Sequence, residues 1–326
     1  FYEDYKERYN IAKKQRKAAK LDMAEEGIAS IAKYRLQPNS MQTEFISNLK
    51  KIVGEGEDRA LLISATGTGK TYASAFAMRE LGFKRVLFLV HRGQLARQTK
   101  KSYENVFDKS VSMGLVGDGY DEYDKDFVFA MIQTLNRDEH LYHYRPDEFD
   151  CIVLDEAHHS SADTYQKVMN YFRPRLFLGM TATPDKRDDD EDGKNVYEIF
   201  NYRIACEIRL KQAMEEDLLC PFHYFGISDI SMVTDKEIKE KKLTPGNFNQ
   251  LVGDERVRHI IAQAKYYGYS GDRVKGLIFC SRIDESKELS RKFNERGYRT
   301  IALNGDSSEQ ERTDAFERLA MDEPED

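Results

Sequence analysis

A run of small residues has the composition of a phosphate-binding loop: Ser64-Ala65-Thr66-Gly67-Thr68-Gly69-Lys70-Thr71. Glycines permit a tight turn whose N–H groups point at phosphates, and the N-terminus of a following helix adds partial positive charge. We expect Lys70 to reach the β- and γ-phosphates of ATP and to act in catalysis, and the Thr71 hydroxyl to bind Mg²⁺. Ser64 stands where the usual pattern has glycine. Four residues are expected to bind the phosphates: Thr66, Gly67, Thr68 and Gly69.

Two adjacent carboxylates follow the apolar segment Cys151–Leu154. At the end of a buried strand, Asp155 would bind Mg²⁺, and Glu156 would orient and deprotonate an attacking water. His158 and His159 come next and could suggest a zinc site. Because no cysteine or carboxylate set at ligand spacing surrounds them, the sequence favours the magnesium site over zinc.

Alternating strands and helices must position these groups. Continuous apolar segments predict buried strands, and the helix-like stretches between most of them predict helices. This alternation predicts a parallel sheet covered by helices on both faces, which binds ligands outside the carboxyl ends of its strands. The predicted strands are 60–64, 86–90, 127–132, 151–154 and 176–180, and the predicted helices are 71–81, 94–106 and 164–172.

A shorter series of the same kind begins near residue 274. Its predicted strands are 274–280 and 299–303, its predicted helices are 285–296 and 309–320, and candidate capping boxes are Ser281–Asp284 and Ser308–Glu311. Because so few strand–helix units bury little apolar surface, we expect this incomplete domain to be poorly ordered or loosely attached. Three segments are therefore expected: a helical segment at 1–35, an ATP-binding α/β domain at 36–215, and a linker with a partial second domain at 216–326.

Composition limits the class of protein. The chain has 326 residues, of which 40% are apolar and 33% charged, and this is typical of folded domains rather than of disordered chains. The net charge of −7 excludes a uniformly basic coat for nucleic acid but allows a local basic track. The four cysteines are not closely paired, and no apolar run could span a bilayer. We expect a cytoplasmic protein without membrane contact. The first residue is Phe1 rather than Met, which suggests a piece of a longer protein.

Taken in order, the motifs resemble those of superfamily 2 helicases and translocases, the DEAD/DEAH-box group in its broad sense. The resemblance covers residues 35 to about 306 and implies a RecA-like domain followed by the beginning of a second RecA-like domain. Besides the phosphate loop and the Asp-Glu-Ala-His motif II, four segments carry it: 90–95 (Val-His-Arg-Gly-Gln-Leu, motif Ia), 132–135 (Ile-Gln-Thr-Leu), 181–184 (Thr-Ala-Thr-Pro, motif III) and 277–282 (Leu-Ile-Phe-Cys-Ser-Arg, motif IV).

The resemblance also implies roles for side chains outside the two phosphate motifs. Gln42 would read the adenine edge of ATP, and Arg35 would pack nearby or contact phosphate. Thr181 and Thr183 would couple the state of the γ-phosphate to domain closure. The residues implied in contacts with the nucleic-acid backbone are His91, Arg92, Gln133, Thr134 and Arg282.

Within the superfamily, the motor subunits of type I and type III restriction enzymes are the most similar group. The His-Arg pair in motif Ia and the last letter of motif II favour DNA over RNA, although RNA stays open. The stretch 218–224 (Leu-Leu-Cys-Pro-Phe-His-Tyr) resembles a bacterial subgroup in which this motor lies between a phospholipase-D-like nuclease and a further C-terminal domain.

The family's motifs V and VI do not occur before Asp326, and motif VI carries the catalytic arginine. We therefore expect the 326 residues to bind ATP but to hydrolyse it slowly. Two functions stay open: an ATP-driven motor on nucleic acid, and a nucleotide-dependent switch that clamps DNA or a partner without movement. A metabolic phosphate-loop kinase is a distant third, because it would need neither Gln42 nor motifs III and IV.

Overall fold

A computed structural model describes residues 7, 11, 36–107, 111–184, 195–226, 253–269 and 274–321. Apart from Glu7 and Ile11, the predicted helical segment 1–35 lies outside the described residues, and Arg35 lies there too. The chain divides into two compact units, Phe1–Phe222 and His223–Asp326. Each unit is described by itself.

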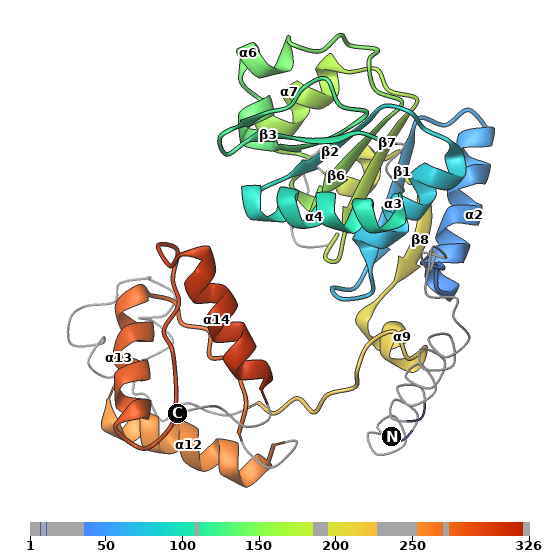
Figure 1. The fold of residues 1–326 in the computed structure, drawn as a ribbon. Coiled ribbons are helices and arrows are strands. Elements are labelled where there is room, and N and C mark those ends of the chain that lie inside the picture. Colours follow the sequence, from blue (N-terminus) through green and yellow to red (C-terminus); the bar gives the residue numbers. More distant parts are fainter. Residues whose placement is uncertain are drawn as a thin grey trace, which may run out of the picture. The chain divides into compact units, whose positions relative to one another are not determined.

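Eight strands in the described part of the first unit form one sheet (Figure 1). They are β1 (Arg59–Ser64), β2 (Val86–Val90), β3 (Met113–Gly117), β4 (Tyr120–Asp121), β5 (Phe127–Met131), β6 (Cys151–Asp155), β7 (Leu176–Thr181) and β8 (Ile204–Ile208). Their order across the sheet is β4-β3-β5-β2-β6-β7-β1-β8. All neighbouring pairs are parallel except β3 and β4, which form an antiparallel hairpin.

The five strands predicted from apolar runs are β1, β2, β5, β6 and β7, and all five lie in the middle of the sheet. Three strands toward the sheet edges were not predicted. In β3, two glycines interrupt the apolar run, and both residues of β4 are exposed. In β8, exposed Ile204 and Glu207 break the run. An edge strand has fewer buried faces than a central one, so its sequence signal is weaker.

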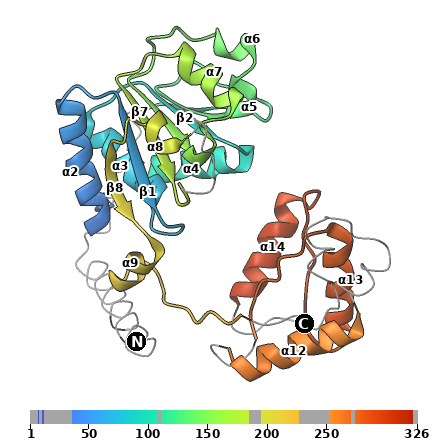
Figure 2. The ribbon, with the colours of Figure 1, turned by 180° about the vertical axis from the view of Figure 1, so that it is seen from behind.

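Helices cover both faces of the sheet (Figures 1 and 2). Side chains alternate along β1: Ala60 and Leu62 enter one core, and Leu61 and Ile63 enter the other. The predicted RecA-like α/β class is therefore confirmed. The first core is covered by α2 (Ser40–Gly54), α3 (Lys70–Leu81) and α4 (Gly93–Val106), and the second by α5 (Ile132–Leu135), α6 (Asp138–Leu141), α7 (Asp163–Tyr171) and α8 (Val196–Ile199).

The second unit contains α12 (Asp254–Tyr267), α13 (Ile283–Asn294) and α14 (Glu309–Ala320). The predicted strands 274–280 and 299–303 are wrong for the structure, because the described residues there form no strand. A strand needs a hydrogen-bonded neighbour, and here Leu277, Ile278 and Phe279 remain exposed instead.

Two helix starts in the second unit test the predicted capping boxes. Ser308 and Glu311 form the expected box at α14. The box at Ser281–Asp284 is wrong, because α13 begins one residue later than that spacing requires and Arg282 is its N-cap. Glu285 instead accepts hydrogen bonds from the backbone N–H and the hydroxyl of Ser281, at 3.1 and 3.0 Å.

Candidate active site

The sheet order brings the motif residues into one row. Five adjacent strands, β5-β2-β6-β7-β1, point their carboxyl ends to the same edge. Gln133 follows β5, His91 follows β2, Glu156 follows β6, Thr181 ends β7, and the phosphate loop follows β1. The residues implied in nucleic-acid contact thus lie toward one side of the row, the carboxylates in the middle, and the nucleotide loop on the other side.

Positive φ angles shape the phosphate loop. Gly67 has φ 91° and Gly69 has φ 89°, and Gly69 is also the N-cap of α3. These angles suit glycine and strain any other residue. Thr68 is buried, and its hydroxyl donates to the carbonyl of Ala65 at 2.7 Å and bonds the Ser64 hydroxyl at 2.5 Å. Ser64, the departure from the usual motif, therefore stabilises the loop from within.

Lys70 lies across the loop. Its Nζ donates a hydrogen bond to the carbonyl of Ser64 at 3.0 Å. Burial lowers the pKa of Lys70, while the nearby charges of Glu156 and Asp155 act in the opposite direction. Thr71, the next residue, is only half-buried at the start of α3, and Thr66 is exposed. The ammonium group thus lies close enough to the motif II carboxylates to share one site with them.

Asp155 and Glu156 differ in their surroundings. Burial, followed by the charge of Glu156, raises the pKa of Asp155 to about 6. Glu156 has the left-handed backbone angles φ 53° and ψ 50°, which are uncommon outside glycine. Its backbone N–H donates to Oδ1 of Asp155 at 3.1 Å. The two neighbouring carboxylates thus differ in burial, since the side chain of Glu156 is 43% exposed.

These residues fit a nucleotide with Mg²⁺. The glycines leave the loop narrow, since a Cβ on Gly69 would come within 2.9 Å of the Gln42 amide nitrogen. A carboxylate with a raised pKa gains from a nearby divalent cation. Within the described ranges, no cluster of three or more His, Cys, Asp or Glu residues could hold a metal ion. A magnesium ion at Asp155 and Thr71 would therefore take its other ligands from phosphate and water.

Gln42 is buried at the start of α2, and both ends of its side chain are bonded within the chain. Its Oε1 accepts from the backbone N–H of Asn39 at 3.0 Å, and its Nε2 donates to the carbonyl of Gly69 at 3.2 Å. Asn39 completes a capping box by accepting from the N–H of Gln42 at 2.9 Å. Gln42 therefore ties α2 to the end of the phosphate loop.

A hydrogen-bonded path joins motif II to motif III. Nδ1 of buried His158 lies 3.0 Å from the Thr181 hydroxyl and 3.4 Å from Oε2 of Glu156. The Thr181 hydroxyl also accepts from the backbone N–H of Thr183 at 3.1 Å. The two threonines thus differ, since Thr181 is fully buried in this path, whereas Thr183 is exposed and joins it through its backbone.

The predicted nucleic-acid residues of the first unit differ in exposure. His91 is half-buried, and its Nδ1 lies 3.4 Å from the amide nitrogen of exposed Gln133. Arg92 is exposed and is the N-cap of α4. Thr134 is buried, with its side chain against Gly117, so it cannot present its hydroxyl as openly as Gln133 presents its amide. The structure therefore brings His91 and Gln133 together and sets Thr134 beneath the surface.

Tyr165 on α7 lies at this edge, although no motif drew attention to it. Its hydroxyl lies 2.9 Å from Nε2 of His91. His158, the last residue of motif II, joins Glu156 to Thr181, a role that the sequence did not predict. Neither role has a local sequence signal, because each depends on residues from different strands meeting at one edge.

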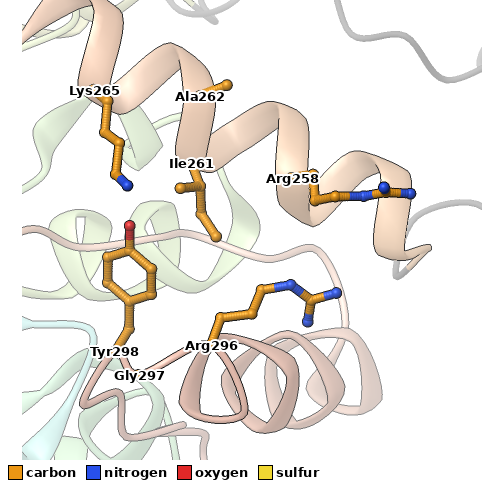
Figure 3. A pocket seen from close by; sticks show the side chains of 7 residues that line it. All are labelled: Arg258, Ile261, Ala262, Lys265, Arg296, Gly297 and Tyr298. Carbon is orange, nitrogen blue, oxygen red and sulfur yellow. The ribbon is translucent and has the colours of Figure 1, made fainter.

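Arg282 lies in the second unit and is exposed at the N-terminus of α13. Its guanidinium donates to both carboxylate oxygens of Asp284, at 3.0 and 2.9 Å. A pocket of about 460 Å³ lies by the other end of that helix, between α12 and the turn after α13 (Figure 3). In Figure 3, Lys265 and Tyr298 point toward each other across this pocket. Arg282 and the pocket are thus separate features of the second unit.

Comparison with known proteins shows what the chain is similar to. Residues 35–186 match the family of the type III restriction enzyme res subunit. The type I restriction enzyme EcoAI endonuclease subunit of Escherichia coli is 27% identical over 288 residues, covering 78% of this chain and 34% of that protein. The DNA 3'-5' translocase XPB2 of Sulfurisphaera tokodaii is 28% identical over 141 residues, covering 43% and 29%. The chain thus spans about a third of the length of these relatives.

A solved structure supports the same fold. The type ISP restriction-modification enzyme LlaBIII, bound to DNA, superposes with a TM-score of 0.56 at 21% identity, over 80% of this chain and 21% of that one. In the described part of the chain, no helix is long and apolar enough to cross a membrane. The resemblance to superfamily 2 helicases and restriction-enzyme motor subunits is therefore confirmed.

Proposed function

We propose that this chain is the core of an ATP-dependent motor on nucleic acid, a helicase or a duplex translocase, with DNA as the favoured track. The observation that carries the proposal is the row of side chains at the carboxyl edge of the sheet. There, the phosphate loop, the Asp155–Glu156 pair and the His91–Gln133 pair follow neighbouring strands. The similarity of this chain to restriction-enzyme subunits and to a DNA translocase also supports the proposed motor.

The position of each residue in the site suits a role in ATP binding or hydrolysis. The backbone of Thr66–Gly69 and the N-terminus of α3 would hold the phosphates of ATP, and Lys70 would leave the Ser64 carbonyl to reach them. Thr71 and Asp155 would hold Mg²⁺, which supplies neutralisation of phosphate charge. Glu156 would orient the attacking water and accept its proton.

Thr181 would couple the state of the γ-phosphate to closure of the two domains. Its hydroxyl bonds His158, which lies beside Glu156, so a change at the γ-phosphate would reach β7 through a short chain of contacts. His91, Arg92 and Gln133 would touch the DNA backbone. Such contacts hold the motor in place without reading sequence.

Residues 36–215 would be the ATP-binding domain, and residues 216–326 a linker and part of the second domain, with Arg282 as a further backbone contact. ATP would be hydrolysed between the two domains. An arginine that neutralises charge in the transition state contributes about 10³–10⁵ in rate. Since motif VI does not occur among these 326 residues, we expect them alone to bind ATP and to hydrolyse it slowly.

Two substitutions test the site. Lys70→Ala removes the side-chain cation from the loop and should abolish tight binding of ATP with Mg²⁺ in a fluorescent-nucleotide titration. Glu156→Gln keeps Lys70 and Asp155, so ATP should still bind while single-turnover hydrolysis falls by about 10²-fold or more. Unchanged affinity in the first variant, or normal hydrolysis in the second, would overturn these assignments.

A further inference from the structure

Tyr165 is a buried polar side chain at the proposed DNA edge. It is 1% exposed on α7, within the second core of the sheet. Its hydroxyl lies 2.9 Å from Nε2 of His91, and the two rings are 5.5 Å apart. A buried hydroxyl needs a hydrogen-bond partner. For Tyr165 this partner is His91, which lies far away in the sequence.

The two nitrogens of His91 have different neighbours. The Gln133 amide nitrogen lies 3.4 Å from Nδ1, and the Tyr165 hydroxyl lies beside Nε2. A neutral imidazole that accepts from the amide at Nδ1 carries its proton on Nε2 and donates it to the tyrosine oxygen. Burial is the main cause that lowers the pKa of His91, with His158 and Arg92 acting in the same direction and Glu156 against it. A neutral ring held at both nitrogens has one orientation.

The same ring touches motif II. His91 packs edge-on against His159 with ring centres 4.7 Å apart, and His159 belongs to the short helical turn Ala157–His159 directly after Glu156. The charges of Asp155 and Glu156 also act on the Tyr165 hydroxyl. The Tyr165–His91 pair therefore lies between the catalytic carboxylates and Gln133.

We propose that Tyr165 is a positioning residue whose hydroxyl fixes the His91 imidazole, so that His91 holds the exposed Gln133 amide in a preformed arrangement for the DNA backbone. This inference rests on the proposed function, because it assumes that the His91–Gln133 pair contacts DNA. Without the tyrosine hydroxyl, the His91 ring can rotate. Fixing the ring when DNA binds then costs free energy, and DNA binding is weaker. Tyr165 itself does not touch DNA or nucleotide in this arrangement.

The test compares two variants that each lose one buried, hydrogen-bonded tyrosine hydroxyl. Tyr165→Phe removes the contact with His91. Tyr103→Phe is the matched control, because Tyr103 is 0% exposed and its hydroxyl bonds Ser74 at 2.8 Å in the other core. ATP hydrolysis by the full-length protein is measured against the concentration of duplex DNA. For Tyr165→Phe we expect the half-saturating DNA concentration to rise roughly three- to ten-fold, the effect of one lost hydrogen bond, with little change in the rate at saturating DNA.

A double-mutant cycle separates positioning from general packing. If Tyr165 acts through His91, then Tyr165→Phe should add nothing to the effect of His91→Ala. The inference is overturned if Tyr165→Phe behaves as Tyr103→Phe does, if it lowers only the rate at saturating DNA, or if its effect persists in full beside His91→Ala. An unsubstituted protein whose hydrolysis ignores DNA would instead contradict the proposed function itself, and with it this inference.

Discussion

The side-chain amide of Gln42 donates a hydrogen bond to the backbone carbonyl of Gly69 at 3.2 Å. This contact joins the first turn of α2 to the N-cap of α3, two positions that the chain separates by a strand and the phosphate loop. The resemblance implies that Gln42 reads adenine, whereas the structure shows it holding the loop. Both roles are compatible, because a glutamine tied to the loop would already be fixed beside a nucleotide bound there.

Gln42→Ala should raise the KM for ATP and reduce the preference for ATP over GTP, because an adenine-specific donor and acceptor are removed. Steady-state hydrolysis with each nucleotide measures both effects. Asn39→Ala is the matched control, since it removes the other half of the capping box but not the contact with Gly69. Equal losses with ATP and GTP would show that Gln42 only anchors the loop.

Gly67→Ala should weaken nucleotide binding and lower the melting temperature. The backbone at Gly67 has φ 91°, and a Cβ there would lie 3.0 Å from Cδ2 of Leu219, which packs over the loop. A residue with a Cβ in this conformation costs about 1–2 kcal/mol before any contact is counted. Nucleotide titration and thermal unfolding measure the two effects.

Gly54→Ala is the control for that substitution. Gly54 ends α2 without a positive φ, and a Cβ there would meet nothing within 4 Å. Alanine should be neutral or slightly stabilising at this helical position. If both variants bind nucleotide like the unsubstituted protein, the strained loop is not part of the nucleotide site.

Asp155→Asn should stabilise the protein at neutral pH when nucleotide and Mg²⁺ are absent. The folded state raises the pKa of Asp155 from 3.8 to about 6, so the folded state binds the proton more tightly than the unfolded state does. The ionised carboxylate therefore lowers the free energy of unfolding above pH 6, by at most about 3 kcal/mol. The gain from asparagine should shrink as the pH falls from 6 toward 4, as measured by denaturant unfolding in EDTA. A gain independent of pH would contradict this cause.

Thr181→Val should separate ATP binding from its coupling to DNA. The substitution keeps the shape of the side chain but removes the hydroxyl that bonds His158 and the N–H of Thr183. We expect near-normal ATP affinity and a reduced stimulation of hydrolysis by DNA. Thr183→Val serves for comparison, because Thr183 donates its hydrogen bond to Thr181 through its backbone N–H, and this bond should survive. Loss of stimulation in the second variant alone would reverse the two roles.

The central strands and the phosphate loop could be predicted from the sequence because each has a local signal. Cys151–Asp155 is an unbroken apolar run ending in a carboxylate, and the loop is a run of small residues before a helix. The helix α2 was not predicted, although Asn39 and Gln42 have the spacing of a capping box.

The remaining parts have no local signal. Tyr165 meets His91 only because α7 and the end of β2 meet at the same edge of the sheet. Ser64 and Thr68 bond each other only once the loop has closed. The segment 274–280 has the pattern of a strand, yet a strand also requires a partner, which the pattern of one segment cannot supply.

The most direct test of the proposed motor is the rate of ATP hydrolysis by the full-length protein, measured with Mg²⁺ alone and then with single-stranded DNA, duplex DNA and RNA. We expect slow hydrolysis without nucleic acid and a rate that rises to saturation with DNA, more than with RNA. Glu156→Gln should abolish the stimulated rate. A rate of hydrolysis that stays the same with and without every nucleic acid would contradict the motor and leave a nucleotide-dependent binding switch.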